Sequence, residues 1–205
     1  MSHSHLIVRD PTELLEHTLK TWRTGTPERG LWVFGYASLI WRPDFEFTQR
    51  CAARVQGWHR ALHMWSRVNR GTPECPGLVF ALLTGGSCQG MVFHVAAAQV
   101  EATLQTLWER EMPTGVYDPR WLNCKTAQGD VSALSFTLPR SSPNYCGVLT
   151  DAQYARIFKE SCGRYGTTLD YAQQTYEGLL REGIHDRALE KLLRNRLGKS
   201  QQIRP

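Results

Sequence analysis

A chain of 205 residues, 41% hydrophobic and 21% charged, is long enough for one domain with a substantial core. No apolar run approaches transmembrane length and the N-terminus has no signal-peptide pattern, so we expect a soluble, cytoplasmic protein without stable membrane association. The net charge is +5, and residues 178–205 alone hold seven Lys or Arg against three Asp or Glu. Without interleaved aromatics or a motif, this basic segment favours a solvated helix face over nucleic-acid binding.

The first expected element is a helix that begins near residue 11. Asp10-Pro11-Thr12-Glu13 offers an N-cap, a proline at the first helical position and a glutamate three residues after the cap. We expect residues 1–30 to form an N-terminal helical extension, residues 31–197 a single domain, and residues 198–205 a basic tail. The apolar face of the first helix would consist of Leu15, Leu19 and Trp22.

The middle of the chain is expected to form strands. A short apolar strand at residues 31–34 runs into Gly35, and aromatic and β-branched residues then cluster between turn-forming residues. A helix that ends near Glu111 interrupts the strands. The other predicted strands cover residues 54–59, 62–65, 78–83, 91–95, 121–126 and 131–138, with turns at residues 70–77 and 84–89 and at Gly129.

The last third is expected to be helical. Thr150 and Gln153 form a capping-box pattern, and two further helices are predicted after Thr167 and after Gly183. Because strands are grouped in the middle and helices at the end, the pattern predicts an α+β domain rather than alternating α/β units. The strands could close into a small barrel, but the pattern alone does not decide closure.

Glu111 is the strongest candidate for chemistry. Val100, Leu104 and Leu107 recur at helical spacing, and the next position on this apolar face is Glu111. Desolvation and the negative end of the helix dipole would both raise the pKa of its carboxyl, as a general acid or base at neutral pH requires. The alternative is a structural ion pair with an arginine such as Arg110 or Arg120.

The segment after the first strand is a candidate ligand-binding loop. A glycine followed by small residues lets main-chain N–H groups face a carboxylate or a developing oxyanion. The segment lacks the residues of a P-loop and the glycine spacing of a dinucleotide site, so a simple tight turn is the alternative. Ser38 as a nucleophile is disfavoured, because no nucleophile-elbow pattern is present and no histidine is suitably spaced. The loop residues are Tyr36, Ala37, Ser38 and Leu39.

Three further side chains are weaker candidates. Arg70 lies in a turn-rich stretch and could bind a substrate carboxylate by bidentate hydrogen bonds, although an exposed loop is the simpler interpretation. Tyr117 and Tyr145 each follow turn-forming residues and could be pocket hydroxyls or packed aromatics.

No metal site or disulfide scaffold is expected. The six cysteines form no Cys-x-x-Cys pair, so we expect free and mostly buried thiols. His3 and His5 belong to a polar terminus, where fraying is the default expectation.

Two of these segments resemble one family. Residues 31–41, with the run Val-Phe-Gly-Tyr-Ala-Ser-Leu-Ile-Trp, resemble the opening motif of the ChaC-like γ-glutamylcyclotransferases, and residues 108–117 resemble the family's Arg-Glu segment. Weaker matches follow in the same order, including the segment that ends at Tyr171. The family usually has glycine where this chain has Ala37, and a left-handed backbone there would strain alanine by about 1 kcal/mol or more.

The resemblance implies a cofactor-free enzyme that cleaves glutathione into 5-oxoproline and cysteinylglycine. Glu111 would be its acid/base catalyst, and no metal would be needed. The implied fold is the cyclotransferase α+β type, with a small barrel-like mixed sheet flanked by helices. Alternatives are a cyclotransferase for another γ-glutamyl amine or dipeptide, and a non-enzymatic regulator of cation transport. Nothing in the sequence specifies an oligomeric state.

Overall fold

Five strands close into a barrel, which settles the question that the sequence pattern left open. The computed structural model describes residues 10–194. Around the barrel the strand order is β1-β3-β2-β4-β5. Neighbouring strands are antiparallel except β1 and β5, which pair in parallel at Trp32–Ala133 and Val33–Leu134, so the sheet is mixed as expected. The strands are β1 Leu31–Gly35, β2 Gln49–Ser66, β3 Gly77–Val95, β4 Asp118–Thr126 and β5 Gly129–Thr137.

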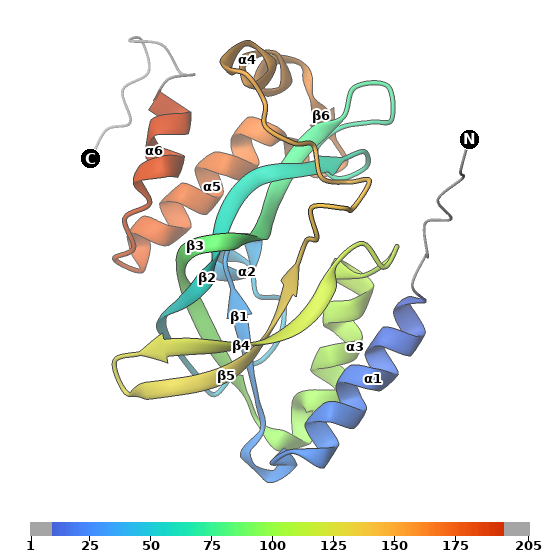
Figure 1. Cartoon of the computed structure of the whole chain (residues 1–205), viewed down its shortest axis with the longest axis vertical. Helices are drawn as coiled ribbons and strands as arrows, with labels where there is room; N and C mark the ends of the chain where they lie inside the picture. The colour runs from blue at the N-terminus through green and yellow to red at the C-terminus, as the bar shows by residue number, and fades with distance from the viewer. Residues whose placement is uncertain (1–9, 195–205) are drawn as a thin grey trace.

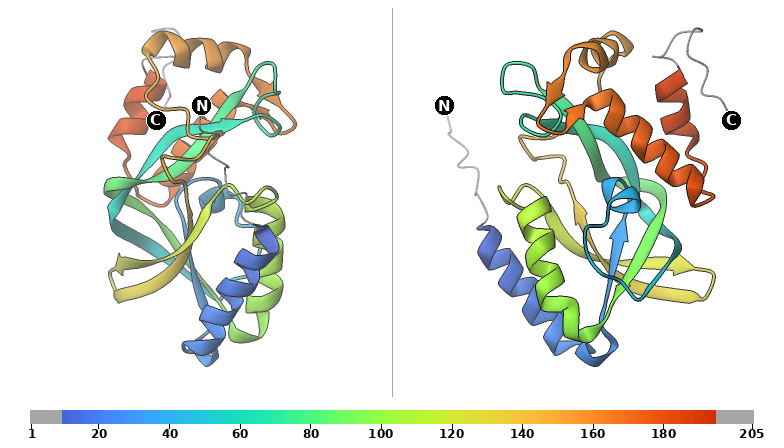
Figure 2. Two further views of the ribbon diagram at one scale, coloured as in Figure 1. Left: turned by 45° about the vertical axis from the view of Figure 1, so that its right-hand side comes forward. Right: turned by 180° about the vertical axis from the view of Figure 1, so that it is seen from behind.

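The larger helices form two groups on different sides of the barrel (Figure 1). Helices α1 (Pro11–Thr24) and α3 (Val100–Glu111) lie side by side in one group. Helices α4 (Asp151–Glu160), α5 (Thr168–Arg181) and α6 (Arg187–Arg194) form the other, as the view from behind also shows (Figure 2). The helical last third is therefore confirmed. The short elements are 3-10 turns η1 Pro27–Arg29 and η2 Ala97–Gln99, helix α2 Ser38–Trp41, and strands β6 Cys162–Gly163 and β7 Gly166–Thr167.

The prediction of four short strands between residues 52 and 95 is wrong, because β2 and β3 are two long strands that pair along most of their length. The predicted turn at residues 84–89 is a bulge inside this ribbon. Gln56 pairs with Ser87 and Trp58 with Thr84, so Gly57 faces both Gly85 and Gly86. All three glycines have positive φ angles, which a bulge tolerates as readily as a turn does.

The predicted N-terminal helix is confirmed, and it packs against α3. Asp10 caps α1 by accepting a hydrogen bond from the Thr12 amide at 2.8 Å. The indole of Trp108 on α3 donates to the Pro11 carbonyl at 2.8 Å, which ties the start of α1 to the end of α3. The expected apolar residues Leu15, Leu19 and Trp22 pack on the core beneath α3.

Helices α4 and α5 begin where the sequence predicts, whereas the third C-terminal helix begins three residues later than Gly183 suggested. Thr150 and Thr167 each form a complete capping box. Helix α6 begins at Arg187, and the Asp186 carboxylate accepts a hydrogen bond from the Leu189 amide at 3.0 Å. The basic tail predicted at residues 198–205 lies outside the described residues, as do His3 and His5.

All six cysteines are free thiols, but the expectation that most are buried is wrong. Cys88 and Cys124 are buried within the barrel, whereas Cys162 is exposed in the short β6 strand and the others are partly exposed. Within residues 10–194, no three His, Cys, Asp or Glu side chains group in a way that could hold a metal ion. No helix in that range is both long and apolar enough to cross a membrane.

The barrel strands contribute alternate residues to two separate hydrophobic cores. Phe34 and Leu82 belong to a core shared with the C-terminal helices, and Val33 and Leu83 belong to a core shared with α1 and α3. The segment that follows β1 takes part in both cores, because Tyr36 and its neighbours join the first and Leu39 joins the second. This segment therefore lies where the two cores meet.

Candidate active site

The loop between β1 and α2 is held by close backbone packing. A Cβ atom at Gly35 would lie 2.8 Å from the Leu39 Cβ, and one at Gly90 on the neighbouring strand would lie 2.4 Å from the Gly35 carbonyl oxygen. Only glycine therefore fits at Gly35. Ala37 has a φ of −144°, outside the left-handed region that favours glycine. Alanine at this position therefore does not carry the strain of a left-handed backbone.

A cleft opens beside this loop, with about 300 Å³ of empty space when the open solvent at its mouth is included. Of the eight site residues predicted from sequence, the structure brings six together there, whereas Arg70 and Tyr145 do not line it. Three aromatic residues from distant elements complete the wall. The lining consists of Tyr36, Ala37, Ser38, Leu39, Phe80, Glu111, Tyr117, Phe136 and Tyr171.

Glu111 is the acidic residue of the cleft, and it ends helix α3. Val100, Leu104 and Leu107 are buried on the same face, as the periodicity predicts, and the Glu111 side chain remains 18% exposed. Burial raises the pKa of the Glu111 carboxyl, and the neighbouring Arg110 guanidinium offsets only part of that rise. Both interpretations of the sequence are therefore present in one residue, an ion pair with Arg110 and a carboxyl with a raised pKa.

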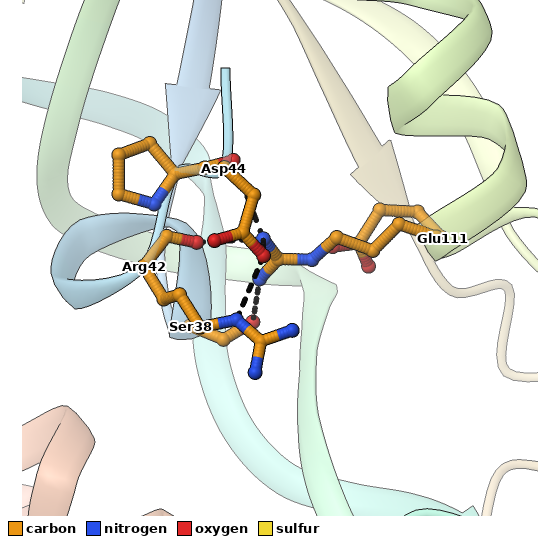
Figure 3. Close-up of polar contacts among 6 residues, drawn as sticks. Ser38, Arg42, Asp44 and Glu111 are labelled. Atoms are coloured by element: carbon orange, nitrogen blue, oxygen red, sulfur yellow. Dashed lines mark hydrogen bonds and ion pairs between the residues drawn. The ribbon is translucent and has the colours of Figure 1, made fainter.

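Arg110 connects Glu111 to Ser38 at the start of α2, and Figure 3 labels both of these partners. Its Nε lies 3.0 Å from the Glu111 Oε1, and its Nη2 donates to the Ser38 Oγ at 3.0 Å. Its Nη1 donates to the Arg42 carbonyl at 2.6 Å and to the Asp44 carboxylate at 3.0 Å. One guanidinium thus fixes the carboxylate relative to α2, and this role went unpredicted. Arg120, the other predicted partner of Glu111, instead pairs with Asp118 at 3.4 Å.

Three tyrosines surround the carboxylate. Burial, with the nearby negative charge of Glu111 contributing, raises the pKa of Tyr36, Tyr117 and Tyr171. The hydroxyls of Tyr36 and Tyr117 also share a hydrogen bond. All three phenols therefore stay protonated at neutral pH and keep their ability to donate hydrogen bonds.

Tyr171, Phe80 and Phe136 were missed by the sequence analysis. Tyr171 lies on α5, and the weak family match that ends at this residue was the available indication of its role. The two phenylalanines lie on β3 and β5 and have no local pattern that separates a cleft wall from ordinary core.

Arg70 and Tyr145 occupy other places. The Arg70 guanidinium donates to the Tyr165 carbonyl and lies 4.9 Å from the centre of the Tyr171 ring, so it touches the cleft wall from behind. The Tyr145 hydroxyl accepts a hydrogen bond from Arg140 at 2.6 Å, and its backbone forms a bridge with Met64. Ser38, which does line the cleft, accepts its hydrogen bond from Arg110 rather than from a histidine.

The arrangement suits proton transfer between Glu111 and a polar group of a ligand bound in the cleft. A carboxyl with a raised pKa can both accept and release a proton near neutrality. The first N–H groups of a helix have no acceptor within the helix, so those at the start of α2 can face a bound ligand. No histidine or cysteine of the described part of the chain is among the lining residues.

Similar proteins carry closely related names. The chain is 34% identical over 169 residues to a glutathione-specific γ-glutamylcyclotransferase of Escherichia coli (strain K12), covering 82% of this chain and 73% of the relative. It is 30% identical over 152 residues to glutathione-specific γ-glutamylcyclotransferase 1 of Homo sapiens, covering 72% and 68% of the two chains. It is 25% identical over 187 residues to γ-glutamylcyclotransferase 2-3 of Arabidopsis thaliana, covering 84% and 93%.

The fold has solved counterparts. A yeast γ-glutamyl cyclotransferase specific to glutathione superposes with a TM-score of 0.73 at 20% identity, covering 82% of this chain and 95% of the yeast chain. The predicted cyclotransferase fold is thereby confirmed. The family model described as "ChaC-like protein" matches residues 31–197. With that match and the identity to the bacterial relative, the chain belongs to the ChaC-like protein family.

Proposed function

We propose that this protein cleaves the γ-glutamyl bond of glutathione by intramolecular cyclisation, giving 5-oxoproline and cysteinylglycine. The observation that carries the proposal is the Glu111 carboxyl, which has a raised pKa and lies in a cleft beside the loop at residues 36–39. The names of the bacterial and human relatives supply the substrate. The compartment we propose is the cytoplasm, where thiols are kept reduced.

Glu111 serves as general base and then as general acid. The substrate's α-ammonium group gives a proton to the carboxylate, and the freed amine attacks the γ-carbonyl carbon of the same glutamyl group. The bond from that carbon to the cysteinyl nitrogen then breaks as Glu111 returns the proton to the leaving nitrogen. The attacking nitrogen also gives up a second proton, which ends on the leaving amine, so 5-oxoproline has a neutral lactam and cysteinylglycine an ammonium group. No water is consumed and no oxidant is needed. Because the nucleophile and the carbonyl belong to one molecule, holding the glutamyl arm folded supplies much of the rate advantage.

The loop after β1 holds the glutamyl arm in this proposal. N–H groups of residues 36–39 bind the γ-glutamyl end and stabilise the tetrahedral oxyanion. The protonated hydroxyls of Tyr36 and Tyr117 add donors beside Glu111. We assign Tyr145 to packing rather than to substrate contact, since its hydroxyl is engaged by Arg140 and it does not line the cleft.

Glu111→Gln is the direct test. The amide keeps the size of the side chain but cannot accept the ammonium proton, so turnover should fall by about 100- to 10,000-fold, the usual range for general acid–base catalysis. The assay incubates purified protein with millimolar reduced glutathione and no added metal, and quantifies 5-oxoproline and cysteinylglycine. Glu109→Gln is the matched control, because that carboxylate lies two residues away on the exposed face of the same helix. Near-wild-type turnover by the Glu111→Gln protein would refute the role.

A second candidate is cyclisation of other γ-glutamyl compounds. One relative is named only as a γ-glutamylcyclotransferase, without glutathione in its name. Assaying γ-glutamyl-alanine beside glutathione separates the two. A higher kcat/KM for γ-glutamyl-alanine would favour the broader or different specificity.

A further inference from the structure

Three arginines gather around Tyr165 beside the cleft. The guanidinium carbon of Arg42 lies 5.6 Å from the centre of the Tyr165 ring, and that of Arg164 lies 5.3 Å from it. Arg70 donates to the Tyr165 carbonyl and lies against Tyr171, which lines the cleft. Tyr165 itself is 47% exposed. This edge of the cleft therefore carries a concentration of positive charge that the proposed proton transfer does not use.

Arg42 is the member of the group that is open to a ligand. Its side chain is 47% exposed and its Nε donates to the Asp44 carboxylate at 2.7 Å. Neither Nη of Arg42 has a hydrogen-bond partner among residues 10–194. Figure 3 shows these two nitrogens turned away from Asp44. Two parallel donors left free on one guanidinium match the two oxygens of a carboxylate.

Arg70 adds positive charge near Arg42, but it is much less exposed to solvent than Arg42. Its residue is only 7% exposed. Burial lowers the pKa of Arg70, the Asp170 carboxylate and Tyr171 oppose that shift, and the positive charge of Arg42 adds to it. Asp44 and Asp170 balance the charges of Arg42 and Arg70, and Arg164, which forms no ion pair within residues 10–194, leaves a net positive charge at this edge.

Arg42 also lies at a suitable separation from Glu111. The Arg110 guanidinium contacts the Glu111 carboxylate at 3.0 Å and the Arg42 backbone carbonyl at 2.6 Å. The positive charge of the Arg42 side chain also opposes the rise in the pKa of the Glu111 carboxyl, so that side chain lies within electrostatic reach of the carboxylate. In glutathione two residues follow the γ-glutamyl bond, and two extended residues span about 7 Å. A peptide with its reacting bond at Glu111 would thus carry its far end to the vicinity of the Arg42 side chain.

We infer that Arg42 binds the terminal carboxylate of the leaving cysteinylglycine portion through its free Nη groups, and that Arg70 reinforces the positive field from behind Tyr171. The inference rests on the proposed function and deepens it, because it explains how the cleft selects a γ-glutamyl tripeptide with a free C-terminus. The α-carboxylate of the glutamyl end is held separately, by the N–H groups of the loop.

The test compares glutathione with its glycine carboxamide, which differs only in the charge of the far end. The wild-type protein should show a kcat/KM about 10- to 100-fold higher for glutathione, mostly through KM, as expected for a charge-assisted hydrogen-bonded pair. Arg42→Gln should lose that factor for glutathione and leave kcat/KM for the carboxamide nearly unchanged. Arg42→Lys, which keeps the charge but not the paired donors, should retain part of the preference. In each variant Asp44 keeps Arg110 as a partner, so folding should be preserved.

Arg23→Gln is the matched control. Arg23 is 53% exposed and pairs with Glu101, at the far end of α3 from Glu111. It should leave both substrates unaffected. Equal kcat/KM for the two substrates in the wild type, or an equal loss on both in Arg42→Gln, would overturn the inference while leaving cyclotransferase activity standing. Absence of 5-oxoproline from every substrate with the wild type would instead refute the proposed function, and this inference with it.

Discussion

Glu111 combines two opposing electrostatic environments in one side chain. Removal from water favours its neutral form, whereas the Arg110 guanidinium at 3.0 Å favours the carboxylate, and the net effect is a raised pKa. Arg110 does not depend on this contact, since it also bonds Ser38, Asp44 and the Arg42 carbonyl. The carboxylate is therefore held in an environment that disfavours its charge, as an acid/base group requires and as stability does not.

Glu111→Gln should accordingly stabilise the protein at neutral pH, by about 0.5–2 kcal/mol. The sign follows from linkage. The pKa of Glu111 is higher in the folded state than in the unfolded state, where it has the ordinary value of 4.5. Ionised Glu111 therefore lowers the stability of the wild-type protein at pH values above its folded-state pKa, and this loss disappears as the pH falls. The advantage of the Gln variant should be largest near pH 7 and shrink on acidification.

Thermal unfolding of the Glu111→Gln and wild-type proteins across this pH range measures the effect. Glu109→Gln, on the exposed face of the same helix, should show no comparable gain. A Gln variant that is less stable than wild type at pH 7 would contradict the argument.

At the scale of elements, the Arg60 side chain on β2 connects the barrel, the cleft loop and α6. It is 3% exposed and donates to the Tyr36 carbonyl at 2.6 Å, to the Gln89 carbonyl at 3.1 Å and to the Asp186 carboxylate. Asp186 in turn caps α6. The position of the loop that begins at Tyr36 thus depends on a buried ion pair with the start of the last described helix.

Asp186→Asn should cost about 3–5 kcal/mol of unfolding free energy, because it leaves the buried Arg60 charge without its counterion. Asparagine is a good N-cap, so loss of the cap is not the main expected effect. Urea unfolding provides the measurement. Glu190→Gln, which breaks an exposed pair with Arg194 on the same helix, should cost only about 0.5 kcal/mol or less. Similar losses in the two variants would show that Arg60 finds other compensation.

Elements set by local pattern were predicted well, and those set by distant contacts were not. The caps at Asp10, Thr150 and Thr167 and the helical spacing that leads to Glu111 involve residues within a few positions of one another. Gly85 and Gly86 have the local character of a turn, and only the partner strand makes them a bulge. The same distinction applies in the cleft, where the loop was found from its own residues.

Distant partners account for what the sequence analysis missed in the site. Tyr171 and the phenylalanine walls reach the cleft only through tertiary folding. The contacts of Arg110 were missed for the same reason. It is adjacent to Glu111 in sequence, yet four of its contacts lie more than sixty residues away, with Ser38, Arg42, Pro43 and Asp44.

For the whole molecule, the seam between β1 and β5 is what closes the barrel. These strands lie about a hundred residues apart in the chain and pair in parallel over only two positions. The buried Ser135 hydroxyl reinforces the seam by donating to the Phe34 carbonyl at 3.1 Å. Pairing between strands so far apart in the chain produces no pattern among neighbouring residues. The sequence therefore could not predict that the strands close into a barrel.

Ser135→Ala should reduce the unfolding free energy by about 1 kcal/mol, the usual net value of a buried hydrogen bond. Ser132→Ala is the matched control, since Ser132 is exposed on the same strand and should change stability by less than about 0.5 kcal/mol. Chemical denaturation of both variants gives the comparison, and indistinguishable midpoints would mean that the seam hydrogen bond is not stabilising.

The cleft at the junction of the two cores also has a consequence for protein synthesis. Its walls come from residues 36–39, 80, 111, 117, 136 and 171, so they cannot meet until nearly the whole domain has left the ribosome and α5 has docked. A nascent or truncated chain lacks Tyr171 and the wall it forms. Under the proposed function, we expect unfinished copies to leave glutathione intact until α5 has packed against the barrel.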